Sequence, residues 1–258
     1  MDQRELRRIA HEALALNASP MFRYQRDCNF VLRDDVAYSR QALPGPGFNW
    51  AAAVGRPVAL NQIRRFGDSF FAGCAGGWGV LVEADAGHPV EAEIRNRGWA
   101  VAEEEPAFVL PEMPLPNGQS AALDIRRVND AAGLRTFTES ACTAFGTPVE
   151  LLDQMMPPEA SAVDPDIAYF VGWSNDQPVA TAMMHKVGST GCIAGVSVLA
   201  EFRRRGFGKA ITAAAIAAAA AAGCRSAALR SGPMAVDLYR QLGFQLACVH
   251  KTYTVPLN

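Results

Sequence analysis

Apolar and polar residues follow two different periods in the second half of the chain, and each period predicts one kind of element. Stretches in which apolar and polar residues alternate predict strands, and stretches with apolar residues three or four apart predict helices. The expected strands are 122–128, 167–173, 178–186, 191–199, 226–230 and 244–255. The expected helices are 129–145, 147–156, a helix that runs to Ala222, and 233–242. The predicted order is therefore β-α-α-β-β-β-α-β-α-β.

Local start and stop signals support these boundaries. Asn129 or Asp130 is placed to cap the helix that follows it, and Thr147 precedes a proline at the first helical position of the next. The polar turn 174–177 separates two alternating runs and predicts a hairpin. Gly223 and Gly243 stand where helices are expected to end. These signals predict short connections between the elements.

The first half of the chain has a weaker pattern. Residues 4–16 are amphipathic and predict a helix, and 89–98 predict another. Strands are expected at 29–34, 48–55, 77–84 and 99–110. The tail of this half, a helix followed by glycine, an aromatic residue and a long strand, resembles the end of the chain at 238–249. We interpret this as an internal repeat in which both halves share one fold and the first half has lost its glycine-rich loop.

The boundary between the halves is expected in the segment 110–120, LPEMPLPNGQS. Three prolines, a glycine and small polar residues disfavour regular structure and suit a linker. The prediction is thus a first domain at 1–118 and a second at 119–258.

Composition excludes several classes of protein. Half of the 258 residues are hydrophobic and 19% are charged, which is ordinary for a soluble globular protein. The net charge is -2 and the pI about 6.1, so no basic field favours nucleic acid or a membrane as partner. The six cysteines are far apart without a CxxC pair, so neither a disulfide framework nor a metal site is expected. The N-terminus lacks the apolar core of a signal peptide, and we expect a cytoplasmic protein.

The most distinctive stretch is FRRRGFGK at 202–209, where three arginines meet a Gly-Phe-Gly. A Walker loop is excluded because Arg203 stands where its first glycine would be and Ala210 follows the lysine. A dinucleotide fingerprint is disfavoured because Ile211 takes the place of the third glycine. What remains is a strand, a glycine-rich loop and a helix. The free N–H groups and the positive end of such a helix attract anionic oxygens, and glycine lets a phosphate come close.

Arg203-x-x-Gly206-x-Gly208 resembles the Arg/Gln-x-x-Gly-x-Gly/Ala signature of the GNAT superfamily of N-acetyltransferases, which binds acetyl-CoA. Segment 196–211 is similar to the fourth strand, phosphate loop and third helix of that family, and MAVDLYRQLGF at 234–244 to its tyrosine-bearing helix. The resemblance covers about 121–255. It implies an α/β (α+β) fold with a mixed, mostly antiparallel central sheet flanked by helices, in two tandem copies if the internal repeat is real.

The resemblance also implies roles for individual residues. The backbone around Ser197 would bind the pantetheine arm like an added strand, with Gly195 marking a bulge that separates this strand from the next. Tyr239 would protonate the departing thiolate, and a Val196 or Val198 amide would hold the oxyanion. The expected acetyl-CoA-binding residues are Val196, Ser197, Val198, Arg203, Arg204, Arg205, Gly206, Phe207, Gly208 and Lys209.

The sequence departs from the family at the general base. Many members place a carboxylate on the fourth strand, but 190–199 contains none. A water chain, Glu139, His185 or a low pKa of the acceptor itself remain as alternatives. Tyr239 could also be a packed aromatic residue, and His185 a structural histidine.

The function predicted from the sequence is transfer of an acetyl group from acetyl-CoA to a primary amine. The acceptor is expected to be a small molecule or a peptide, and the protein a monomer with an internal pseudo-dimer, or a homodimer. A non-catalytic CoA-binding regulatory module is the first alternative, because the carboxylate is missing. A dinucleotide-dependent oxidoreductase is the second.

Overall fold

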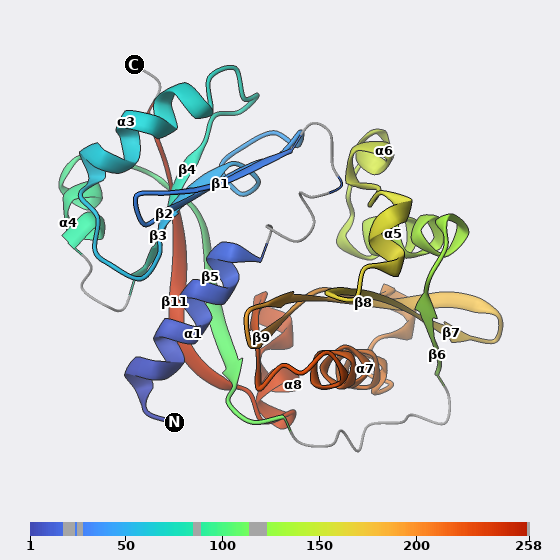
Figure 1. The fold of residues 1–258 in the computed structure, drawn as a ribbon. Helices are drawn as coiled ribbons and strands as arrows, with labels where there is room; N and C mark the ends of the chain where they lie inside the picture. Colours follow the sequence, from blue (N-terminus) through green and yellow to red (C-terminus); the bar gives the residue numbers. More distant parts are fainter. Residues whose placement is uncertain (18–23, 25–27, 85–88, 114–122, 257–258) are drawn as a thin grey trace.

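The computed structural model describes residues 1–17, 24, 28–84, 89–113 and 123–256. Its strands form one continuous sheet in the order β1-β2-β3-β4-β11-β5-β10-β9-β8-β7-β6, with helices on both faces (Figure 1). Two neighbouring pairs, β3–β4 and β9–β10, are parallel, and every other pair is antiparallel. The predicted mixed, mostly antiparallel sheet is confirmed.

The second half contains the predicted elements in the predicted order. Its strands are β6 (Asp124–Val128), β7 (Ile167–Ser174), β8 (Gln177–Val187), β9 (Thr190–Val198), β10 (Ser226–Arg230) and β11 (Gln245–Thr254). Its α-helices are α5 (Ala131–Phe145), α6 (Leu152–Met155), α7 (Phe207–Ala221) and α8 (Val236–Gln241). The helix expected at 147–156 is shorter, because Val149–Leu151 forms a 3-10 turn before α6. Asp130 caps α5 by accepting a hydrogen bond from the amide of Gly133.

The first half contains two elements that the pattern analysis missed. Its helices are α1 (Gln3–Leu16), α3 (Leu60–Phe70) and α4 (Pro89–Asn96), and its strands are β1 (Asn29–Arg33), β2 (Val36–Arg40), β3 (Trp50–Ala53), β4 (Gly79–Glu83) and β5 (Val101–Leu110). β2 and α3 were not expected. The first four residues of β2 are all buried, so the strand lacks the alternation that identifies a half-exposed strand.

The two halves repeat one topology. The turn Asp34–Asp35 joins β1 to β2, and Asn175–Asp176 joins β7 to β8, with all four residues at positive φ. In each half a parallel pair follows the hairpin, with α3 or α7 as the crossover, and a short helix then leads to a ten-residue strand. The predicted internal repeat is thus visible in the order of the elements.

The halves exchange their last strands. β4 pairs with β11 rather than with β5, and β10 pairs with β5 rather than with β11. β5 and β11 pair with each other along most of their length at the centre of the sheet. The strands from β1 to the centre of the sheet therefore have the same arrangement as the strands from β7 to the centre. The two halves are related by a pseudo-twofold symmetry within one chain. Of the linker predicted at 110–120, Leu110 is the last residue of β5, and residues 114–120 lie outside the described residues.

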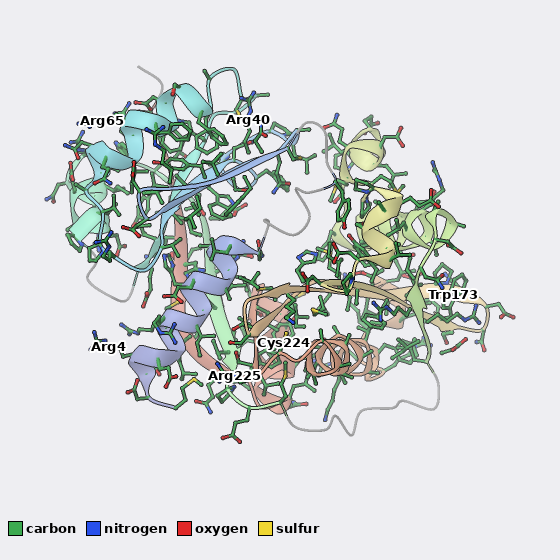
Figure 2. The ribbon with its side chains drawn as sticks, viewed as in Figure 1. Arg4, Arg40, Arg65, Trp173, Cys224 and Arg225 are labelled. Atoms are coloured by element: carbon green, nitrogen blue, oxygen red, sulfur yellow. The ribbon has the colours of Figure 1, made fainter. Side chains whose placement is uncertain are left out.

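Packed side chains fill the space between the sheet and the helices in both halves (Figure 2). Helix α7 packs over β7, β8 and β9 on one face, and α5 covers the same strands on the other. Helix α1 lies across the centre, where Leu6, Ala10 and Leu14 contact residues of β5, β9, β10 and β11. α1 thus holds the seam between the halves. Among the described residues, no helix is both long enough and apolar enough to cross a membrane.

Candidate active site

Strands β9 and β10 separate before they end. Their parallel pairing stops at Cys192 and Ala228, although β9 continues to Val198 and β10 to Arg230. The last six residues of β9 therefore lack a β10 partner, and their edge faces a crevice between the two strands. An open strand edge of this kind can pair with an extended ligand.

A bulge bends β9 at this point. Ser197 pairs with Thr181 and Ala194 pairs with Met183, so Gly195 and Val196 oppose a single residue of β8. Gly195 has φ +58, and the hydroxyl of Thr181 donates to its carbonyl at 2.7 Å. Because Thr181 has only one hydroxyl hydrogen, Ser197 Oγ is the donor in the 2.7 Å contact between the two hydroxyls. The expected bulge at Gly195 is confirmed, and Ser197 is engaged with β8.

Val198 directs its backbone into the crevice. The amide of Leu199 donates to the carbonyl of Val179 at 2.9 Å, and hydrogen-bonded pairs alternate with non-hydrogen-bonded pairs in an antiparallel ladder. The N–H and C=O of Val198, one residue earlier, must therefore point away from β8. The carbonyl accepts a bond from Arg203 Nε at 3.1 Å, and the N–H has no partner among the described residues.

The loop between β9 and α7 presents a run of backbone amides. Within the part of the chain that the structure describes, no backbone hydrogen bond satisfies the N–H groups from Arg204 to Lys209. Arg204 has φ 64 and Gly206 has φ 82, so left-handed and ordinary residues alternate. Such alternation turns successive N–H groups toward one concavity and creates an anion-binding nest. A left-handed arginine is strained, and strain of this kind gathers at functional sites.

The side chains of the loop divide into two groups. Arg203 donates to the carbonyls of Val198 and Ala144, so its guanidinium braces the loop against β9 and α5. Arg205 donates to the carbonyl of Glu201 at 3.0 Å and lies over the ring of Phe202. Arg204 and Lys209 are exposed cations beside the free amides.

Glycine is required at the two positions of the motif for different structural reasons. An added Cβ at Gly206 would meet nothing within 4 Å, so its left-handed φ is what requires glycine. A Cβ at Gly208 would lie 2.8 Å from Leu238 Cδ1. Gly208 therefore lets α7 approach α8, the helix that carries Tyr239.

Tyr239 lies in the core on the α7 side of the sheet. Only 4% of its surface is exposed, and its ring contacts Phe244 and, from the exchanged strand β5, Phe108. Burial raises the pKa of Tyr239 to about 12, which keeps the phenol protonated at neutral pH. No hydrogen bond to this hydroxyl is found within the described chain, so a reacting group could receive its proton.

A cavity of about 310 Å³ lies on the opposite face, between the halves. Ala194 and Gly195 of β9 and Arg230 of β10 line it, so both strands that border the crevice also border the cavity. The loop 41–48 and Trp50 supply the wall from the first half, and α5 supplies the wall from the second. A ligand in the crevice and a ligand in the cavity can thus meet through the split in the sheet.

The structure distinguishes the candidates for a general base. His185 lines the cavity, but burial lowers its pKa to about 4, and the backbone of Asn17 raises it only in part. Its ring is therefore neutral at pH 7 and too weakly basic to take a proton from an ammonium group. Glu139 is exposed on α5, pairs with Arg135 at 3.3 Å and does not line the cavity.

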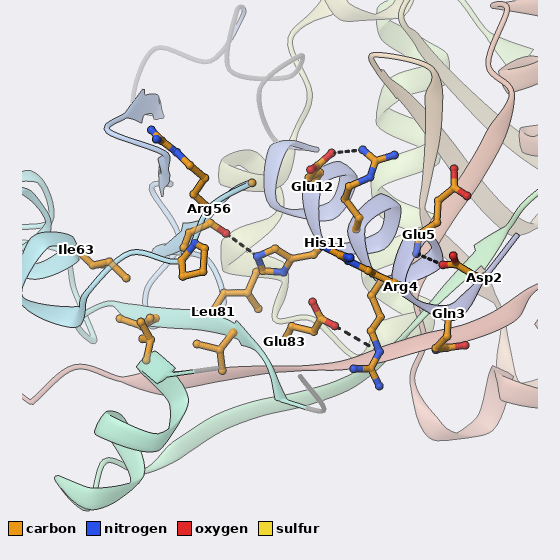
Figure 3. A pocket seen from close by; sticks show the side chains of 18 residues that line it. Asp2, Gln3, Arg4, Glu5, His11, Glu12, Arg56, Ile63, Leu81 and Glu83 are labelled. Carbon is orange, nitrogen blue, oxygen red and sulfur yellow. Dashed lines mark hydrogen bonds and ion pairs between the residues drawn. The ribbon is translucent and has the colours of Figure 1, made fainter. Parts of the chain in front are cut away.

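The equivalent crevice of the first half is filled by the chain itself. The pairing of β3 and β4 stops at Ala52 and Leu81, and the amide of Val54 donates to the carbonyl of Asp35, so Ala53 corresponds to Val198. His11 of α1 points into this crevice and binds the carbonyl of Ala53 through Nε2 at 2.7 Å (Figure 3). An adjoining cavity of about 730 Å³ is lined by as many acidic as basic side chains: Asp2, Glu5, Glu12 and Glu83 against Arg4, Arg7, Arg8 and Arg56.

The sequence motifs lie beside the crevice, and they do not identify the residues of the first half that line the cavity. The lining residues from the first half, such as Leu43, Phe48 and Trp50, carry no motif. Their position depends on the exchange of β5 and β11, which no local pattern reveals.

Comparisons with known proteins agree with this geometry. Residues 135–244 match the model of the acetyltransferase (GNAT) family. A GCN5-related N-acetyltransferase from Kribbella flavida has a TM-score of 0.71 and 19% identity, over 96% of each chain. A GCN5-related N-acetyltransferase from Sphaerobacter thermophilus has a TM-score of 0.59 and 13% identity, over 100% of this chain and 96% of the other. No curated protein matches the chain. The second half therefore carries a GNAT-family domain, and both similar structures extend over the first half as well.

Proposed function

We propose that this protein is an acetyl-CoA-dependent N-acetyltransferase that acts on a primary amine. One observation supports this most strongly: the amides from Arg204 to Lys209, which have no backbone partner among the described residues, lie in the loop after β9, whose open edge borders both the crevice and the cavity. In the proposed arrangement the amides hold the pyrophosphate, with Arg204 and Lys209 adding charge. The backbone of Val196 and Val198 holds the pantetheine arm.

In the proposed reaction, Val198 and Tyr239 act on the thioester. Acetyl-CoA supplies an electrophilic thioester carbonyl, which a neutral amine nitrogen attacks. The N–H of Val198 donates to the developing oxyanion, and Tyr239 gives its proton to the thiolate when the carbon–sulfur bond breaks. The new amide nitrogen loses one proton, so the products are the amide and the thiol. The proton that leaves the nitrogen replaces the one that Tyr239 gave to the thiolate.

The acceptor must lose the proton of its ammonium form before it attacks. We assign no side chain to this step, because His185 is too weakly basic and Glu139 lies on the surface. A largely apolar cavity disfavours the charged form of an amine and lowers its pKa. The cavity can therefore supply the neutral amine without a dedicated base.

The two crevices indicate different roles for the two halves of the chain. We propose that residues 119–258 bind acetyl-CoA and that residues 1–118 form a degenerate copy that covers the acceptor and lends strand β5. In the first half, His11 fills the equivalent crevice and binds the carbonyl of Ala53, the counterpart of Val198. We propose a cytoplasmic enzyme in which a single chain forms a complete active site.

Release of thiol from acetyl-CoA, with a panel of primary amines, tests the proposal. We expect acceptor-dependent release, and Tyr239→Phe should lower turnover about 100-fold while the affinity for CoA stays near normal. Tyr38→Phe is the matched control, because this buried hydroxyl bonds to the Ile63 carbonyl in the first half. If CoA binds but no amine causes thiol release, the protein is a CoA-binding module. If Tyr239→Phe turns over like the parent, Tyr239 is a packing residue.

A further inference from the structure

The cavity between the halves is lined mainly by apolar side chains. Its wall is largely apolar and includes aromatic, aliphatic and methionine side chains from both halves: Leu43, Phe48, Trp50, Phe137, Phe145, Met155, Pro157 and Met183. Its volume of about 310 Å³ is near the lower limit for small-molecule sites, about 300 to 1,000 Å³. A wall and a volume of this kind fit a small amine with an apolar body.

Charge in the cavity is restricted to one place. Among the described residues that line it, Arg230 is the only charged side chain, since His185 is neutral, and no carboxylate contributes to the wall. Arg230 stands two residues beyond Ala228, the last residue of β10 that pairs with β9, so its cation lies beside the split where transfer would occur. An acceptor with a negative charge close to its amine would find a partner there.

Two carboxylates of β5 lie next to this position without lining the cavity. Glu105 Oε2 is 3.3 Å from Arg230 Nη1, in a pair that is 37% and 19% exposed. Glu103 lies against Gly47, which lines the cavity. Glu105 therefore orients Arg230 and competes with any carboxylate that the cavity receives.

We infer that the acceptor is an α-amino acid with a large apolar side chain, whose carboxylate binds Arg230 while its side chain packs against Phe48 and Phe137. This inference rests on the proposed acetyl transfer and specifies its substrate class. An α-amino acid carries its carboxylate one carbon from its amine, which matches a single cation beside the transfer point. Arginine binds a carboxylate through two parallel hydrogen bonds.

The same wall disfavours polycationic acceptors. A polyamine or an aminosugar keeps several ammonium groups after one is acetylated, and each needs a carboxylate or water. The described wall offers these groups no carboxylate and one repelling cation. We therefore expect spermidine to be a poor acceptor.

Three acceptors test the inference: L-phenylalanine, phenethylamine, which lacks the carboxylate, and spermidine. Thiol release should be fastest with L-phenylalanine. Arg230→Gln should lower kcat/KM for L-phenylalanine about tenfold or more and leave that for phenethylamine nearly unchanged. Arg225→Gln, an exposed arginine just before β10 (Figure 2), is the control and should change neither value.

A second variant keeps the test independent of the folding of Arg230→Gln. Glu105→Gln removes the competing carboxylate and should lower KM for L-phenylalanine but not for phenethylamine. If phenethylamine or spermidine is preferred, or if both variants affect all acceptors alike, the inference is wrong although acetyl transfer stands. If no amine in any panel supports thiol release, the proposed function itself fails.

Discussion

The two glycines of the loop can be separated experimentally. Gly206 is left-handed with open space around it, so Gly206→Ala adds backbone strain of about 1 kcal/mol without a steric clash. The strain should open the nest of amides and weaken CoA binding about tenfold, which calorimetry can measure.

Gly188→Ala is the matched control for this change. Gly188 has φ +57, and a Cβ there would also meet nothing within 4 Å, but it lies in the turn between β8 and β9. Both variants should lose similar stability, and only Gly206→Ala should lose CoA affinity. Equal CoA affinity in the two variants would show that the amide nest does not bind CoA.

At the scale of residues, the sequence predicts where the glycine-rich loop lies but not which side chains its residues contact. The spacing of Arg203, Gly206 and Gly208 was enough to place the loop. That Arg203 reaches Ala144 on α5, and that Gly208 faces Leu238, depends on packing between elements far apart in the sequence. The role of Gly208 in helix packing could therefore not be anticipated.

Helix α1 contacts strands of both halves, and a histidine pair fixes one end of this docking. The carbonyl of Ala53 can only accept, so His11 Nε2 donates to it, and a neutral His11 must then accept from His250 Nε2 at 3.3 Å. His250 Nδ1 is buried without a partner among the described residues. Protonation of His11 would put a hydrogen on Nδ1, against the Nε2–H of His250. Protonation of His250 would leave a buried, charged Nδ1–H without a partner among the described residues. α1 is thus docked through two neutral histidines.

This arrangement predicts a loss of stability in mild acid. Burial lowers the pKa of His11, His185 and His250 in the folded protein, whereas their ordinary value is 6.5. The unfolded chain therefore binds more protons as the pH falls below about 6.5, and the free energy of unfolding should decrease by up to about 1.4 kcal/mol per pH unit for each histidine.

Urea denaturation at pH 7.5 and pH 5.5 measures this effect. The parent should be clearly less stable at pH 5.5, and His11→Gln should show a smaller difference, because it removes one of the titrating rings. A parent whose stability is the same at both pH values would contradict the buried neutral pair.

At the scale of elements, the sequence predicts those that carry a turn or capping signal. β7 and β8 were placed through the polar turn between them, although the first six residues of β7 are buried, and α5 was placed through its cap. β2 was missed because its first four residues are buried, and its turn, Asp34–Asp35, was not recognised as the counterpart of Asn175–Asp176.

The whole molecule depends on the exchange of β5 and β11. Without residues 1–118, β10 would lose β5, and β11 would lose both of its neighbours. The isolated fragment 119–258 should therefore be poorly soluble, since its unpaired edges and the apolar surface under α1 would be exposed. Local sequence patterns could not show this exchange, because the same strands would also fit two separate sheets.

Co-expression provides the control for the fragment experiment. The halves are held by strand pairing and core contacts, so fragments 1–118 and 119–258 made together should form a soluble complex. Size-exclusion chromatography distinguishes the outcomes. A fragment 119–258 that is monomeric, stable and as active as the whole chain would show that the first half is an independent module.

Hydrogen–deuterium exchange with and without acetyl-CoA tests the central claim most directly, because it reports on the two related crevices in one experiment. Acetyl-CoA should slow exchange of the amides at 196–198 and 204–209. The amides at 53–60, where His11 fills the equivalent crevice, should exchange at an unchanged rate. Protection at 53–60, or no protection at 204–209 when acetyl-CoA is saturating, would contradict the assignment of the site.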